Sequence, residues 1–85
     1  MTRHPNPLRA RLCFRGRLDP AVFADFAARR AALLRLEATW CAASRDYFEC
    51  EVAGAPEMVD AFHMACWLGP PHAMIEAVDI ERTTG

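Results

Sequence analysis

The sequence predicts an α+β domain in which four antiparallel strands form a sheet and two helices cover one of its faces. Two kinds of periodicity lead to this prediction. Apolar and polar residues alternate at residues 8–15 and 47–52, which is typical of strands with one buried face. Apolar residues recur at helical spacing after Asp19 and Pro20 and again after Pro56. Asp19 is suited to cap a helix, and proline suits the first position of a helix.

The composition limits the class of protein. The chain has 85 residues, which suits one domain, and a hydrophobic fraction of 53% is enough for a packed core. The net charge is −1, so no global field attracts nucleic acid or anionic lipid. No apolar run approaches the roughly 20 residues of a membrane span, and the N-terminus lacks the apolar segment of a signal peptide. We therefore expect a cytoplasmic protein with no membrane partner.

The first half of the chain predicts a strand, a helix and a short strand. Residues 1–7 are polar, contain two prolines and are expected to form a flexible tail. The first strand is expected at residues 8–15, and the first helix at residues 20–34. A short strand at residues 39–42 follows, with Trp40 pointing inward.

The second half predicts a strand, a helix and a closing strand. The third strand covers residues 47–52, and the second helix covers residues 56–68 before the Gly-Pro-Pro sequence at 69–71 stops it. The fourth strand, residues 75–80, breaks strict alternation near its start, which indicates a β-bulge. Residues 82–85 are expected to form a second tail.

The element order βαββαβ is typical of a ferredoxin-like sandwich, in which a four-stranded antiparallel sheet carries two helices on one face. The domain is expected to span residues 8–81, with strands in the spatial order 4-1-3-2. The predicted core consists of Phe14, Phe23, Phe26, Leu34, Trp40, Phe48, Val52, Phe62, Ile75 and Val78.

Several short motifs resemble those of the acylphosphatase family and occur in the same order. Residues 14–18, Phe-Arg-Gly-Arg-Leu, look like the start of the family's Gly-Arg-Val loop. The further landmarks are the aromatic pair Phe23 and Phe26, then Gly54, Ala61-Phe62, the Gly-Pro-Pro-His-Ala sequence at 69–73, and the closing strand with Ile75, Val78 and Ile80. The match is gapless over roughly residues 9–81. The resemblance implies the same βαββαβ fold and, for an intact site, hydrolysis of acyl phosphates.

The resemblance also implies an anion loop whose key groups are altered here. The family holds phosphate with loop N–H groups and an Arg just after the loop, and an Asn at the end of the second strand orients the attacking water. These two positions are Ala24 and Ala42, so no catalytic residues are expected. Asp19 and Pro20 replace the family's Gln-Gly, which adds a negative charge and removes one N–H donor. The residues of this degenerate anion loop are Gly16, Arg17, Leu18, Asp19, Pro20, Ala21, Val22 and Phe23.

Two functions therefore remain open. The first is a non-catalytic binding or regulatory module for an unknown protein or small anion. The alternative is an acylphosphatase-type hydrolase with a rebuilt phosphate site that uses Arg17 on the loop, with Arg15 and Arg45 as further candidates. Neither hypothesis involves a cofactor.

The arginines of the first strand suggest nucleic-acid binding at first sight. Arg9, Arg11 and Arg15 share one face of this strand, and related sheets bind RNA through aromatic residues on that face. Tyr47 is the only aromatic residue expected there. The expected strand order places the arginines opposite acidic residues of the neighbouring strands, namely Glu49, Glu51, Asp79 and Glu81. We therefore expect paired charges and no nucleic-acid partner.

The sequence predicts no metal site. The cysteines at positions 13, 41, 50 and 66 form no CxxC or CxxH motif, which favours free thiols over a disulfide framework or a zinc site. His63 lies on the apolar face of the second helix without a Cys, Asp or Glu at helical spacing, which favours a structural role over a ligand or base.

Met64, Trp67 and Leu68 lie close together on the second helix. They form a candidate apolar patch for a partner or a homodimer. Packing of Trp67 under the turn at residues 69–71 is the alternative.

Overall fold

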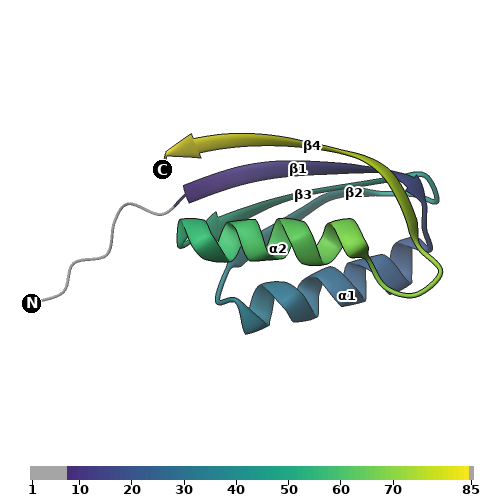
Figure 1. Ribbon diagram of the computed structural model, residues 1–85, viewed down its shortest axis with the longest axis horizontal. Helices are drawn as coiled ribbons and strands as arrows, with labels where there is room; N and C mark the ends of the chain where they lie inside the picture. Colours follow the sequence, from purple (N-terminus) through teal and green to yellow (C-terminus); the bar gives the residue numbers. More distant parts are fainter. Residues whose placement is uncertain (1–7, 85) are drawn as a thin grey trace, which may run out of the picture.

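The computed structural model describes residues 8–84. The elements are β1 (Leu8–Arg17), α1 (Pro20–Leu33), β2 (Glu37–Ala43), β3 (Tyr47–Gly54), α2 (Pro56–Leu68) and β4 (Met74–Thr84). The strands form one antiparallel sheet in the order β2-β3-β1-β4, and both helices cover the same face of this sheet (Figure 1). The predicted ferredoxin-like fold and strand order are confirmed. The tail predicted at residues 1–7 lies outside the described residues.

The core lies between the sheet and the helices. Phe14, Phe23, Phe48 and Phe62 are almost completely buried there. The Phe23 ring meets the Phe48 ring edge to face, with 4.8 Å between centroids, an arrangement that aromatic rings favour. The predicted core residues Phe26, Leu34, Ile75 and Val78 are only partly buried and pack around this centre.

The position of β2 at the edge of the sheet explains why one predicted core residue is exposed. Trp40 pairs with the buried Cys50, so it faces the helices as predicted. Its ring lies 5.9 Å from that of Phe48, yet 43% of Trp40 is exposed because no strand lies beyond β2. The prediction that Trp40 belongs to the core is therefore wrong.

The closing strand is longer than predicted. β4 continues to Thr84, which pairs with Leu8 of β1. The C-terminal tail predicted from Arg82 is therefore wrong for residues 82–84, because the start of β1 offers them a hydrogen-bonding partner that the local sequence does not indicate. Gly85 lies outside the described residues.

The predicted bulge in β4 is confirmed. Arg15 pairs with Ala77 and Gly16 with Ile75, so Glu76 is the extra residue. A Cβ atom at position 16 would collide with the carbonyl oxygen of Met74. Glycine is therefore required at this position for the close approach of β1 and β4.

We predict that Phe62→Ala lowers the free energy of unfolding by about 3–5 kcal/mol, because Phe62 is completely buried and the substitution leaves a cavity. Phe26→Ala should cost less, because the Phe26 side chain is only partly buried. Urea unfolding measures both changes. Leu33→Ala is the control, since Leu33 is 74% exposed. A loss below about 1 kcal/mol for Phe62→Ala would contradict the core assignment.

Candidate functional site

The degenerate anion loop connects the central strand β1 to the N-terminus of α1. Its backbone is tied to the turn between β2 and β3. The N–H group of Gly16 donates to the carbonyl oxygen of Asp46 at 3.2 Å, and the N–H group of Leu18 donates to that of Arg45 at 2.8 Å. These two donors are consequently engaged within the protein.

The Asp19 side chain occupies the N-terminus of α1. Its Oδ1 atom accepts hydrogen bonds from the N–H groups of Ala21, at 3.0 Å, and Val22, at 3.1 Å. The Asp19 carbonyl oxygen also accepts from the N–H group of Phe23 at 2.8 Å. Because Pro20 has no N–H group, the first turn of the helix presents no other free donor.

The loop therefore holds an anion that belongs to the chain itself. Free N–H groups at a helix N-terminus attract anions, and the Asp19 carboxylate already occupies those of Ala21 and Val22. A phosphate group would have to displace this carboxylate and would be repelled by it.

The two positions at which the sequence resemblance implies a catalytic Arg and Asn both carry alanine. Ala24 is half-buried in α1 and packs against the core. Ala42 is exposed near the end of β2, and the last residue of that strand is also alanine, Ala43. Neither residue can supply the amide group that would orient water.

An open hollow of about 500 Å³ lies beside the loop. It is lined by Leu18, Asp19, Pro20, Ala21 and Arg45. Arg17 is not among these residues. It is exposed at the end of β1, opposite Met74 of β4. The structure thus brings Arg45, from the β2–β3 turn, to the hollow in place of the Arg17 considered in the sequence-based hypothesis.

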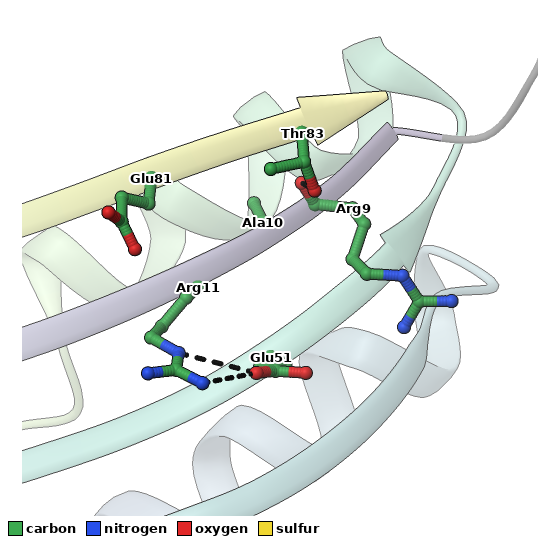
Figure 2. Close-up of a pocket in the computed structure, with 6 residues that line it drawn as sticks. All are labelled: Arg9, Ala10, Arg11, Glu51, Glu81 and Thr83. Carbon is green, nitrogen blue, oxygen red and sulfur yellow. Dashed lines mark hydrogen bonds and ion pairs between the residues drawn. The ribbon is translucent and has the colours of Figure 1, made fainter. Parts of the chain in front are cut away.

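The open face of the sheet carries the predicted cross-strand charges. Arg11 binds Glu51 with an Nη2–Oε2 distance of 2.8 Å (Figure 2). The Nη1 atom of Arg11 lies 3.5 Å from Oε2 of Glu49. The hydrogen bond to Glu51 raises the pKa of Arg11 above its ordinary value. Arg15 lies 3.9 Å from Asp79. Arg9 makes no ion pair with any of residues 8–84.

Tyr47 extends this polar network. Its hydroxyl group lies 3.3 Å from the Cys13 sulfur and donates to Oε1 of Glu49 at 2.7 Å. Both contacts raise the pKa of Tyr47, since each favours the protonated hydroxyl. The aromatic residue of the open face is therefore engaged within the sheet.

All four thiols are free, and two of them are buried. Burial raises the pKa of Cys66 to about 12, and burial likewise raises the pKa of Cys50. His63 is half-buried on α2. The described residues contain no group of three or more His, Cys, Asp or Glu side chains that could hold a metal ion.

The candidate patch on α2 is exposed. Met64 is 60% exposed, Trp67 42% and Leu68 75%. Trp67 is therefore not enclosed by the turn at residues 69–71, which was the alternative placement. Within residues 8–84, neither helix is long and apolar enough to span a bilayer.

Solved structures share this fold at low sequence identity. An acylphosphatase from Coxiella burnetii aligns with a TM-score of 0.83 and 20% identity over 92% of this chain and 82% of that chain. An acylphosphatase from Bacillus subtilis aligns with a TM-score of 0.83 and 18% sequence identity, covering 92% of this chain and 87% of that chain. Full-length HypF in its phosphate- and nucleotide-bound form aligns with a TM-score of 0.83 and 19% sequence identity, covering 100% of this chain but only 11% of that chain.

These comparisons establish an acylphosphatase-like fold, as the sequence motifs predict. Neither a protein-family model nor a curated protein matches the sequence.

We predict that inorganic phosphate does not shift the amide NMR signals of Ala21 and Val22 in the wild-type protein, because the Asp19 carboxylate occupies these groups. Asp19→Gly frees both N–H groups at a small cost in helix stability and should allow their signals to shift on titration. Asp19→Asn is the matched control, since its neutral carbonyl oxygen can keep the same hydrogen bonds. Equal phosphate-induced shifts in all three proteins would contradict this account.

We also predict that single-stranded RNA does not bind the open face at physiological salt. The reason is that Arg11 and Arg15 are paired with acidic residues, which repel phosphate. Fluorescence polarisation with a labelled oligonucleotide tests this prediction. Micromolar binding that Arg11→Ala abolishes would contradict it.

Proposed function

We propose that this protein is a non-catalytic acylphosphatase-like domain that acts as a binding or regulatory module. The observation that carries the proposal is the pair of hydrogen bonds from Ala21 and Val22 to the Asp19 carboxylate. They occupy the N–H groups that a phosphate ligand would need at the start of α1.

The missing side chains support the same proposal. Transfer of a phosphoryl group depends on neutralising its oxygens and aligning the attacking group. Ala24 supplies no positive charge and Ala42 no amide. Loss of one well-placed donor typically lowers kcat by about 10²–10³. The loss of several such groups would leave little catalysis, although the effects are not additive.

One observation favours a second candidate function, a hydrolase of acyl phosphates with a rebuilt site. Arg45 lines the hollow beside Asp19 and makes no ion pair within residues 8–84. It could neutralise a phosphoryl group there, which Arg17 at the end of β1 is less well placed to do.

The site of action and the partner are also part of this proposal. Free thiols at all four cysteines support a reducing compartment such as the cytoplasm. The module would bind a protein or a small anion. Exposed Met64, Trp67 and Leu68 offer a surface for a partner or a second copy.

Turnover of benzoyl phosphate by the purified protein tests the proposal. We expect no hydrolysis above background. Arg45→Ala and Arg17→Ala are the matched variants, because each removes one exposed arginine near the loop. Wild-type turnover that Arg45→Ala abolishes, while Arg17→Ala retains it, would overturn the non-catalytic proposal and support a site rebuilt around Arg45.

A gain-of-function series tests the loop directly. Ala24→Arg combined with Ala42→Asn should restore little activity, because Asp19 and Pro20 still obstruct the phosphate position. Adding Asp19→Gln and Pro20→Gly should raise turnover above that of the double variant. High activity in the double variant alone would show that the carboxylate of Asp19 does not obstruct the loop.

A further inference from the structure

β4 forms one edge of the sheet. One side of its backbone pairs with β1, and no strand of the described chain lies on the other side. From Ala77 to Thr84 the pairing with β1 is regular, and this stretch contains no proline. Proteins prevent another strand from joining an edge with proline, bulges and charged side chains. Residues 77–84 contain no proline or bulge, and their charged residues Asp79, Glu81 and Arg82 restrict pairing to strands of complementary charge. The backbone of residues 77–84 is therefore suited to pair with an added strand.

The opposite edge is less suitable. β2 covers Glu37–Ala43, and its register with β3 shifts between Trp40 and Ala42. The extra residue, Cys41, interrupts the row of backbone groups in the middle of this short strand. An added segment would therefore find a longer regular row on β4 than on β2.

On the open face, the β4 edge is acidic and incompletely neutralised. Asp79 and Glu81 point to this face, opposite Cys13 and Arg11 of β1. Arg11 is directed away from Glu81, toward Glu51, and Glu81 makes no ion pair within the described part of the chain (Figure 2). The Arg15–Asp79 pair is long, at 3.9 Å, and exposed. Arg or Lys side chains of an added strand would lie beside these carboxylates.

On the helix side, the same edge is apolar at Val78 and Ile80 and charged at Arg82. Val78 and Ile80 pair with the fully buried Phe14 and Leu12, yet they are only half-buried themselves. They keep accessible surface because β4 is the last strand of the sheet. Apolar side chains of an added strand would extend this row.

The exposed residues of α2 continue the apolar surface. Asp60 of α2 binds Arg82 of β4 at 2.9 Å, so this side of the helix faces the β4 edge. Met64 and Trp67 lie four and seven residues after Asp60, which places them on the same side of the helix. Both are exposed. The flank between α2 and β4 is thus charged at the Asp60–Arg82 pair and apolar at Met64 and Trp67.

A second copy of the chain does not fit this edge well. Antiparallel pairing of two β4 strands about a central twofold axis would place acidic residues of one copy beside those of the other. Depending on the register, Asp79 or Glu81 of one copy would lie directly opposite Asp79 or Glu81 of the other copy. Like charges directly opposite each other are destabilising. A partner strand with the opposite charge avoids this repulsion.

We propose that residues 77–84 of β4 bind an extended segment of a partner protein in which Arg or Lys alternates with apolar residues. The basic residues would lie beside Asp79 and Glu81, and the apolar residues beside Val78, Ile80 and Trp67. This inference names a partner class for the proposed binding module and in that respect rests on the proposed function. Residues 77–84 pair with residues 8–15 and not with the anion loop, so the two proposals can fail separately.

The test uses a fluorescein-labelled heptapeptide of alternating Arg and Val with the whole protein in fluorescence polarisation. A peptide of the same composition with its Arg and Val residues in two blocks is the matched control. Two further peptides carry N-methyl groups on every Val or on every Arg. Since alternate N–H groups of a strand point to the same side, one N-methylated peptide must lose binding if it pairs with β4.

On the protein, the double variant Asp79→Arg, Glu81→Arg should weaken binding of the alternating peptide about tenfold, because two favourable cross-strand pairs become unfavourable. Asp25→Arg combined with Glu37→Arg is the matched control, with the same change of charge at two exposed residues of α1 and of the opposite edge strand β2. This control should bind like wild type. The peptide should shift amide NMR signals of residues 77–84.

Several results would overturn the inference. The first is equal binding of the alternating and block peptides, and the second is undiminished binding of both N-methylated peptides. The third is an equal loss of affinity for the alternating peptide in both double variants. The fourth is a set of amide shifts centred on residues 16–23. A dimer in sedimentation that protects the amides of residues 77–84 would also overturn it, because a second copy would then cover the edge. Turnover of benzoyl phosphate would refute the proposed function without affecting any of these readings.

Discussion

The hydrogen bonds between the Asp19 carboxylate and the N–H groups of Ala21 and Val22 are the constraint on which the candidate site depends. These donors can serve the start of α1 as a cap, or they can serve a bound anion, but they cannot do both. A cap of this kind contributes about 1 kcal/mol to helix stability. The chain therefore stabilises its first helix with the groups that an acylphosphatase-like site would need for phosphate.

The backbone of the loop is held in place for reasons independent of a ligand. Gly16 must be glycine because β4 passes too close for a Cβ atom, and Leu18 is buried and hydrogen-bonded to the β2–β3 turn. These requirements belong to the fold itself. They explain how the loop can resemble an anion site in shape while the Asp19 carboxylate occupies the N–H groups of Ala21 and Val22.

Residues whose environment is set by local sequence could be predicted, and those set by distant partners could not. The alternation at residues 8–15, the prolines at the helix starts and the irregular spacing near Ile75 predicted the strands, the helices and the bulge correctly. The extension of β4 depends on pairing with Leu8, and the exposure of Trp40 depends on β2 being an edge strand. At the site, the sequence indicated both a helix cap and a harmful charge at position 19, and the cap is confirmed, because the Asp19 carboxylate accepts from the N–H groups of Ala21 and Val22.

The charges of the open face show how one pairing choice shapes the rest of the surface. Arg11 lies between Glu51 of β3 and Glu81 of β4 in the register, and it binds Glu51. Glu49 lies within reach of the same guanidinium, so the two acidic residues of β3 share the single charge of Arg11, while Glu81 makes no ion pair among residues 8–84. Since β3 is an interior strand and β4 an edge strand, the uncompensated charge lies where the sheet can still accept a strand. The N–H groups of Ala21 and Val22 in the loop are occupied by the Asp19 carboxylate, whereas the β4 edge retains unpaired backbone groups and a carboxylate without an ion pair among residues 8–84. Recognition of a partner by this domain is therefore better supported at the β4 edge than at the loop.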